Sequence, residues 1–146
     1  RILLRTQNHA AGTDIVVQEI GGEVPYFTDG RRHYPVMYVL NDAEYRIWVW
    51  GREVVLAQRK WRTVDADCHP WIRSRWAWEK FEPRDLASPL SVNSVKAVEV
   101  CGLDFGAVDI AERDGKVRVL EVNSAPGLSE TTARIYANKF REIEGE

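Results

Sequence analysis

Two segments in the last third of the chain decide the fold: GLDFGAVDI, residues 102–110, and VLEVNSAPGL, residues 119–128. Each contains a run of apolar and β-branched residues, which is typical of a strand. The Asp-Gly pair at 114–115 lies between them and favours a tight turn. The sequence therefore predicts a hairpin with strands over 105–111 and 117–122 and a turn over 113–116.

Both strands carry a carboxylate among apolar residues. Asp109 lies in the first strand, Glu121 in the second, and Asn123 follows two residues later on the same face as Glu121. A three-residue loop would place Asp109 opposite Glu121, whereas a two-residue turn would place it opposite Leu120 and separate the carboxylates. Two carboxylates and an amide oxygen on one face would suit magnesium. A metal site here therefore requires an odd loop or a bulge.

Two alternatives use the same pattern. A strand pair with one face in water carries acidic residues without any function. A metal-dependent hydrolase could use the same carboxylates, but the sequence lacks the histidine-rich ligand set that many such enzymes have.

The rest of the chain also favours an α+β class with consecutive antiparallel strands. Predicted strands cover 1–6, 15–20, 36–40, 44–50 and 53–60, with a tight turn at Gly51-Arg52. No regular structure is predicted for 61–85.

Two helices are predicted. The first begins with Ser88 as N-cap and Pro89 as first helical residue, and Gly102 fits its C-cap. Its expected buried residues recur every three positions: Val92, Val95, Val98 and Cys101. The second covers 130–142, with apolar residues available for burial at Ala133, Ile135, Tyr136, Ala137 and Phe140.

Composition excludes several classes of protein. Of 146 residues, 45% are hydrophobic and 29% charged, with a net charge of −2, so we expect a folded protein with no general attraction to nucleic acid or membranes. The tryptophan- and arginine-rich stretch at 61–78 could stack bases, but near-zero charge favours a small hydrophobic core. Cys68 and Cys101 show no disulfide or zinc pattern, which suits the cytoplasm.

The two segments quoted first, with a spacing of twelve from Asp109 to Glu121 and with Pro126-Gly127 close behind, resemble the closing motif of the ATP-grasp superfamily. The motif is similar to that of ribosomal-protein glutamate ligases and glutathione synthetases, and most of all to phage-type carboxylate–amine ligases. The resemblance implies an ATP-grasp fold of antiparallel sheets with packed helices. It also implies that Asp109, Glu121 and Asn123 hold magnesium ions on the ATP phosphates.

Earlier segments extend the resemblance to nucleotide binding. The stretch from Arg5 through His9 to Gly12 resembles the strand and glycine-rich loop that cover the triphosphate. Asp14 stands where the family usually has a glycine or a basic residue, so an ordinary hairpin connection is the alternative. Tyr38 and Val39 resemble the hinge beside adenine, for which a buried strand is the alternative.

Three basic residues match catalytic positions of the family. Arg46 lies in an acid-x-Arg strand, Lys60 follows nine residues after Gly51, and Arg73 resembles the first member of an Arg-Asn pair, with Ser74 in place of Asn. The resemblance implies that they stabilise charge on phosphate or acyl phosphate. Solvated surface charges are the alternative.

Together these matches imply a magnesium- and ATP-dependent ligase that joins a carboxylate to an amine, or less often a thiol, through an acyl phosphate. Its substrates would be small molecules or peptides. Residues 1–37 would belong to the small nucleotide-covering subdomain and 38–146 to the larger subdomain with the metal site. The N-terminal part of the family fold is absent before Arg1, so we expect a further domain or a partner chain. The alternative is a non-catalytic ATP-grasp-like module for binding or assembly.

Overall fold

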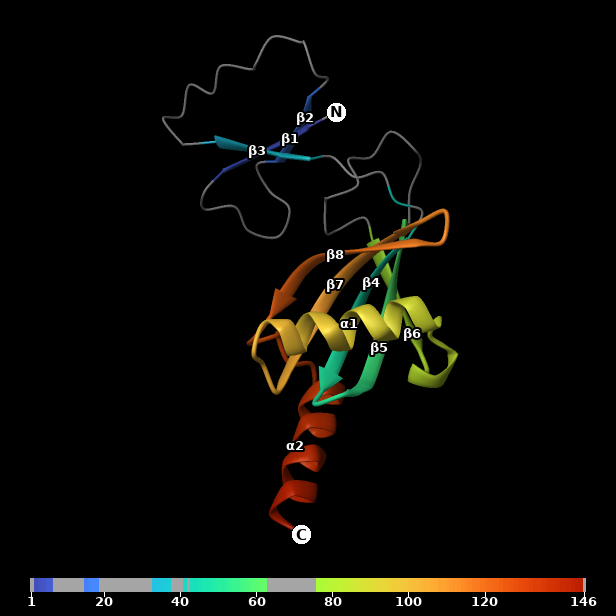
Figure 1. Ribbon diagram of the computed structural model, residues 1–146, viewed down its shortest axis with the longest axis vertical. Helices are drawn as coiled ribbons and strands as arrows, with labels where there is room; N and C mark the ends of the chain where they lie inside the picture. The colour runs from blue at the N-terminus through green and yellow to red at the C-terminus, as the bar shows by residue number, and fades with distance from the viewer. Residues whose placement is uncertain are drawn as a thin grey trace. The chain divides into compact units, whose positions relative to one another are not determined.

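The structure is a computed structural model (Figure 1) that describes residues 2–6, 15–18, 33–37, 41, 43–62 and 76–145. Side chains are described for residues 41, 43–60, 79–80 and 82–145. The chain forms two compact units, one of residues 1–40 with 62–77 and one of 41–61 with 78–146. The predicted division at residue 37 concerns nucleotide and metal binding and stays a prediction.

The first unit contains a three-stranded sheet of β1 (Ile2–Thr6), β2 (Ile15–Gln18) and β3 (His33–Met37), in the order β2-β1-β3. β1 pairs antiparallel with both neighbours, which confirms the predicted pairing of the first two strands. β3 begins earlier than the predicted run at Val36, because His33 and Tyr34 pair with the end of β1.

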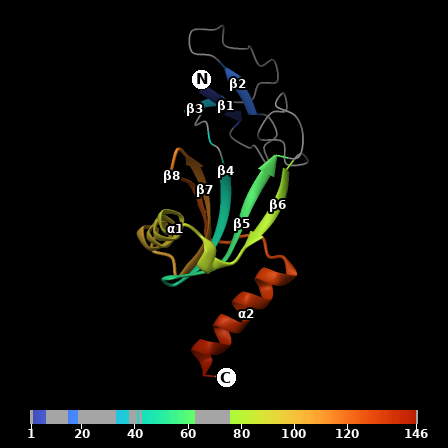
Figure 2. The same cartoon turned by 90° about the vertical axis from the view of Figure 1, so that its right-hand side faces the viewer.

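The second unit contains most of a five-stranded sheet in the order β6-β5-β4-β7-β8 (Figures 1 and 2), of which only residues 62 and 76–77 belong to the first unit. Its strands are β4 (Ala43–Trp50), β5 (Glu53–Arg62), β6 (Trp76–Phe81), β7 (Phe105–Arg113) and β8 (Lys116–Asn123). The pairs β4–β5, β4–β7 and β7–β8 are antiparallel, so the predicted α+β class is confirmed.

The prediction that 61–85 lacks regular structure is wrong at both ends of that stretch. β5 continues to Arg62, β6 occupies 76–81, and a 3-10 helix, η2, covers Pro83–Asp85. The segment WAWEKF of β6 is rich in aromatic residues, which fit a strand that pairs along β5.

Both tight hairpins have two-residue turns. Gly51 adopts a φ of 54° in the turn between β4 and β5, as predicted. In the last hairpin Arg113 pairs with Lys116, so the turn is shorter than the predicted 113–116. Asp114 and Gly115 both have positive φ, 50° and 70°, which suits the twist of the flanking strands and lets them extend to the turn.

Helix α1 (Ser88–Val100) begins one residue earlier than predicted. Ala87 is the N-cap, because its carbonyl accepts from the backbone N–H groups of Leu90 and Ser91. Gly102 lies one residue beyond the C-cap, with a φ of 67°. Its N–H and that of Leu103 donate to carbonyls of the last turn, which ends the helix in a Schellman motif.

The buried face of α1 also differs from the prediction. Leu90, Ser94 and Val98 are buried and recur every four residues, whereas Val92 and Cys101 are exposed and Val95 is partly buried. Ser94 is compatible with the core because its hydroxyl donates to the Leu90 carbonyl at 2.8 Å. This face packs on one side of the sheet, against alternate residues of β4 and β7.

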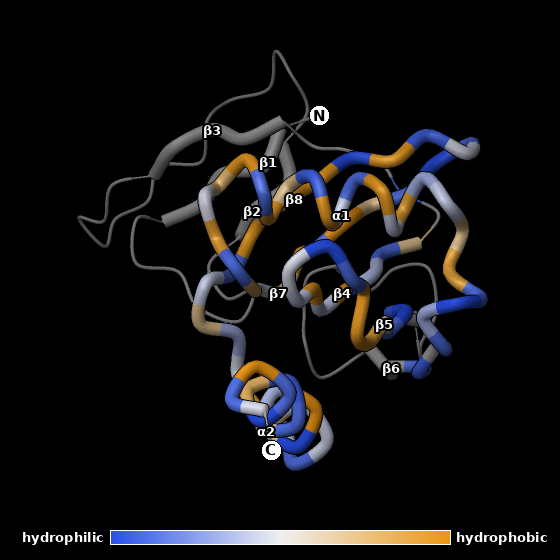
Figure 3. The backbone as a smooth tube through the Cα atoms, turned by 60° about the horizontal axis from the view of Figure 1, so that its bottom comes forward, coloured by the Kyte–Doolittle hydropathy of each residue, from blue (hydrophilic) through white to orange (hydrophobic). Residues whose placement is uncertain are grey.

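Helix α2 (Glu130–Glu144) contacts the opposite side of the sheet (Figure 2). The Ser129 side chain caps it at its start, and Gly145 ends it. Hydrophobic and hydrophilic residues both occur around the helix (Figure 3), and its contact with the sheet is aromatic: Tyr136 and Phe140 pack against Trp50 and Phe105.

Burial along α2 bears out only part of the predicted set. Tyr136 is buried and Ile135 partly buried, but Ala133, Ala137 and Phe140 are exposed. Burial raises the pKa of the Tyr136 hydroxyl to about 12. No helix in the described ranges is long and apolar enough to cross a membrane.

Gly106 allows the close approach of β7 and β8, and we expect Gly106→Ala to destabilise the protein by about 1–3 kcal/mol. A Cβ at this position would lie 2.9 Å from the backbone oxygen of Asn123. Gly127→Ala is the control, because a Cβ there would meet no atom within 4 Å. Urea unfolding of both variants measures the difference, and equal stabilities would contradict this account.

Candidate functional site

The last hairpin contains a β-bulge, and the bulge brings the predicted metal ligands together. From the Asp114-Gly115 turn, pairing is regular as far as Ile110 opposite Val119. The next pair is Asp109 opposite Glu121, so Leu120 is an extra residue in β8. Directly opposed residues lie on the same face of an antiparallel pair. The predicted juxtaposition of Asp109 and Glu121 is therefore confirmed as geometry.

The hairpin of β4 and β5 has the same construction. Val49 pairs with Val54 and Trp48 with Leu56, which makes Val55 the extra residue in β5. Because of this shift, Glu44 lies opposite Lys60. Pairing from β4 to β7 is unbroken, and it places Arg46 opposite Asp109.

One face of the sheet consequently collects the candidate polar residues in two neighbouring rows. The first runs from Gln58 through Arg46 and Asp109 to Glu121, and the second contains Lys60 and Glu44. Asn123 is on the same face, opposite Ala107.

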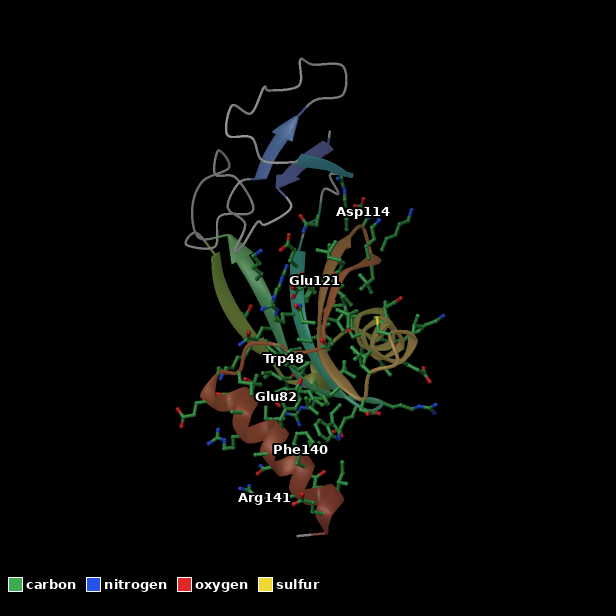
Figure 4. The ribbon with its side chains drawn as sticks, turned by 90° about the vertical axis from the view of Figure 1, so that its left-hand side faces the viewer. Trp48, Glu82, Asp114, Glu121, Phe140 and Arg141 are labelled. Atoms are coloured by element: carbon green, nitrogen blue, oxygen red, sulfur yellow. The ribbon has the colours of Figure 1, made fainter. Side chains whose placement is uncertain are left out.

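Helix α2 covers the other, apolar part of this face. It packs near Trp48, Ala107, Trp50 and Phe105. Figure 4 shows Glu121 on the sheet farther from α2 than Trp48. The carboxylates therefore lie beside the apolar contact and not beneath the helix.

Arg46 and Asp109 form a bidentate ion pair. The Arg46 Nε donates to Asp109 Oδ1 at 2.7 Å, and Nη2 donates to Oδ2 at 2.6 Å. Both side chains are about three-quarters buried, with 26% and 22% exposed. These hydrogen bonds, together with the charges of Asp109 and Glu121, raise the pKa of the Arg46 guanidinium, which stays charged.

Glu121 and Asn123 differ in their surroundings. Glu121 is exposed, and in the described part of the chain no hydrogen bond or ion pair engages its carboxylate. The Nδ2 atom of Asn123 is buried and has no hydrogen-bond partner among the described residues. A buried amide nitrogen without a partner is unusual in a folded protein. As a donor it would suit an oxygen atom of a ligand, whereas a cation would bind the Oδ1 atom of Asn123.

The donor set fits a hard divalent cation. Asp109 and Glu121 supply carboxylate oxygens and Asn123 an amide oxygen, which are the atoms that magnesium prefers. Within the described ranges no group of three or more His, Cys, Asp or Glu side chains is placed to hold a metal ion, so a cation here would use two carboxylates and the amide.

Glu44 was not among the predicted site residues, although it anchors one of them. Its side chain is 9% exposed, Lys60 Nζ donates to Oε2 at 2.8 Å, and Asn41 Nδ2 donates to Oε1 at 2.7 Å. The signal in the sequence was an acidic residue facing a basic one across a predicted hairpin. Counting residues from the turn without a bulge pairs Glu44 with Arg59, so the contact with Lys60 was not predicted.

The remaining predicted site residues are not tested by the geometry. Arg5 belongs to β1, but its side chain lies outside the described part. His9, Gly12, Tyr38, Val39 and Arg73 also lie outside the described residues. Their proposed roles stay predictions.

Comparison with known proteins relates the chain to ATP-grasp ligases by fold. No protein-family model matches the chain, and no curated protein matches it. D-alanine–D-alanine ligase from Bacillus anthracis complexed with ATP is similar with a TM-score of 0.54 and 15% identity, over 70% of this chain and 35% of that one.

Two peptide-bound structures are also similar. The macrocyclase MdnC from Microcystis aeruginosa MRC, bound with precursor peptide MdnA, gives a TM-score of 0.51 and 16% identity over 94% of this chain and 49% of that one. A RiPP-associated ATP-grasp ligase from Chryseobacterium gregarium, in complex with ADP and a leader and core peptide, gives a TM-score of 0.50 and 18% identity. The match covers 92% of this chain and 45% of that one.

These similarities show the fold: the chain has an α+β architecture of the ATP-grasp type. It spans from about a third to about half of the length of the proteins that it matches. The fold expected from the closing motif is therefore confirmed, while the phage-type resemblance stays a prediction.

The Glu44–Lys60 pair is buried, and we expect Glu44→Ala to lower the free energy of unfolding by about 2–4 kcal/mol, because a buried ammonium loses its carboxylate. Glu99→Ala is the matched control. It removes a carboxylate paired with Arg52 at 3.3 Å, where the side chains are 59% and 86% exposed, and should change stability by less than about 1 kcal/mol. Chemical denaturation compares them, and a Glu44→Ala protein as stable as the control would refute a structural role for the pair.

Proposed function

We propose that this chain is the metal- and nucleotide-binding part of an ATP-dependent ligase that joins a carboxylate to an amine through an acyl phosphate. The observation that carries the proposal is the bulged hairpin, which sets Asp109 opposite Glu121 on a face with Asn123. A solvated sheet face needs no such register, and the two neighbouring carboxylates attract positive charge, part of which Arg46 supplies.

Asp109, Glu121 and Asn123 would hold magnesium in the proposed site. The ion, when bound, would neutralise charge on the phosphates of the nucleotide and act as a Lewis acid. The three residues come from paired strands, so the sheet fixes their backbone positions before any ligand binds.

Arg46 and Lys60 would stabilise negative charge that develops on the transferred phosphoryl group and on the acyl phosphate. In this reaction a carboxylate oxygen attacks the γ-phosphorus and ADP leaves, and an amine then displaces phosphate from the acyl carbon. Both steps depend mainly on positioning and charge stabilisation by the protein. Arg46 lies beside Asp109, and Glu44 fixes the Lys60 ammonium one row away.

The nucleotide and substrate assignments rest on the resemblance and on the similar structures. Those structures hold ATP, or ADP with a leader and core peptide, or a precursor peptide, which supports a nucleotide and a small or peptide carboxylate and amine. Arg5, His9 and Gly12 would cover the phosphates, Tyr38 and Val39 would border adenine, and Arg73 would add positive charge. Residues 1–37 would form the nucleotide-covering part.

Isothermal titration of a non-hydrolysable ATP analogue into the chain, with and without magnesium, tests the proposal. We expect binding that depends on magnesium and that weakens at least tenfold in an Asp109→Asn/Glu121→Gln variant, because a loss of about 1.4 kcal/mol gives a factor of ten. An Asp85→Asn/Glu142→Gln variant is the control, since it removes two carboxylates that are 63% exposed.

The outcomes separate the ligase from the alternative. Binding that is equal in both double variants would reject the carboxylate pair as the metal site. A folded wild-type chain that binds no nucleotide would favour a non-catalytic module with the ATP-grasp fold.

A further inference from the structure

Arg46 is already the counter-ion of the carboxylate pair. Its guanidinium engages both oxygens of Asp109 at 2.6–2.7 Å, and Glu121 is directly opposite Asp109 in β8. Two carboxylates and one guanidinium leave one net negative charge on a face that is largely shielded from water at Asp109. The positive charge that the pair needs is therefore supplied by the protein.

A divalent cation and this guanidinium would compete for the same atoms. Magnesium requires oxygen ligands at about 2.0–2.1 Å in a nearly octahedral arrangement. Each Asp109 oxygen already accepts a short charge-assisted hydrogen bond, which orients the carboxylate toward Arg46. A cation on Asp109 would also lie next to a like charge, and that repulsion is strong where water is excluded.

We propose that Arg46 holds the place of the divalent cation on Asp109, and that the site takes up its cation together with the nucleotide phosphates and not alone. The inference rests on the proposed function and deepens it. The Arg46 guanidinium would exchange one partner for another. It binds Asp109 when no phosphate is bound, and it would bind a phosphate oxygen once it leaves Asp109.

The charges favour release of Arg46 from Asp109 only when the cation and the phosphates bind together. Adding a divalent cation to the two carboxylates and Arg46 changes one net negative charge into one net positive charge, which suits the phosphates. Arginine is suited to the exchange, because its planar fork matches carboxylate and phosphate oxygens in the same bidentate way. By linkage, the nucleotide must raise the affinity for the cation by the same factor by which the cation raises the affinity for the nucleotide.

Binding of Mn²⁺ alone to the 146-residue chain tests the inference, with free Mn²⁺ measured by electron paramagnetic resonance and no nucleotide present. We expect Arg46→Gln to bind Mn²⁺ roughly three- to tenfold more tightly than wild type, as the loss of one partly buried ion pair allows. Arg46→Lys should give a smaller gain, since it keeps the charge but loses the fork.

Arg118→Gln is the matched control. Arg118 is exposed on β8, opposite Ala111 and one row from Asp109, so its loss removes the same charge from the neighbourhood without touching the carboxylates. Because Arg118 is exposed, water weakens its interaction with the carboxylates, and its loss should change the affinity for Mn²⁺ by less than about twofold. Equal tightening by Arg118→Gln and Arg46→Gln would overturn the inference, because it would reflect general electrostatics.

A second arm adds ADP. ADP should raise the affinity of the wild type for Mn²⁺ more than that of Arg46→Gln, and an equal increase would overturn the inference. Circular dichroism verifies that each variant is folded. If Arg46→Gln is unfolded, Arg46→Lys is the test: tighter Mn²⁺ binding than wild type supports the inference, and unchanged or weaker binding overturns it. If neither the wild type nor a folded Arg46 variant binds Mn²⁺, the carboxylate pair is not a cation site, and the metal site of the proposed function is refuted. If the wild type binds and no variant binds more tightly, only the role of Arg46 is refuted.

Discussion

Register across two hairpins is the constraint on which this molecule depends. Each return strand contains one residue more than a regular ladder needs, Val55 in β5 and Leu120 in β8. Side chains alternate from face to face, so a slip of one residue exchanges the two faces of a strand. The extra residues place Lys60 of β5 on the same side as Glu44 of β4, and Glu121 of β8 on the same side as Asp109 of β7. Bulges occur often beside functional sites for this reason.

The two faces of the five-stranded sheet differ in the side chains that they carry. One face packs against α1 and carries Tyr45 together with small and β-branched side chains, of which Ile47, Val49 and Val108 are fully buried. The other is divided along the strands, with aromatic residues near α2 and charged residues beyond it. The side chains of Arg46 and Lys60 are themselves largely buried, with 26% and 15% exposed, and a drier environment strengthens their ion pairs.

The sequence predicted much of this arrangement because strand and turn signals act locally. The alternation of apolar residues and the glycines at 51 and 115 were sufficient for both hairpins. Asp-Gly chemistry indicates a two-residue turn, while the shared face of Asp109 and Glu121 requires an odd register. Only the strand pairing of the folded hairpin shows that a two-residue turn and a bulge occur together. The phosphate-loop and hinge residues lie outside the described part, so their placement rests on resemblance alone.

Helix α1 shows the limit of periodicity. Three valines spaced by three suggested a buried stripe. The residues that face the sheet are instead spaced by four, and one of them, Ser94, is polar. A serine whose hydroxyl donates to a carbonyl of its own helix can be buried, yet hydropathy alone counts it as polar. The missed contact between Glu44 and Lys60 has a similar origin, because long-range register and not residue type determines it.

The exposed Leu120 has a consequence for how such a protein can change over generations. Substitution at this position would alter little, since its side chain is 44% exposed and serves mainly to lengthen the strand. Loss of the codon would be different in kind: the hairpin would become more regular, and the acid of β8 would turn to the opposite side of the sheet. A one-residue deletion between the turn and Glu121 would thus separate Asp109 from Glu121 although it removes neither of them. The arrangement depends on the number of residues in the strand as well as on their identities.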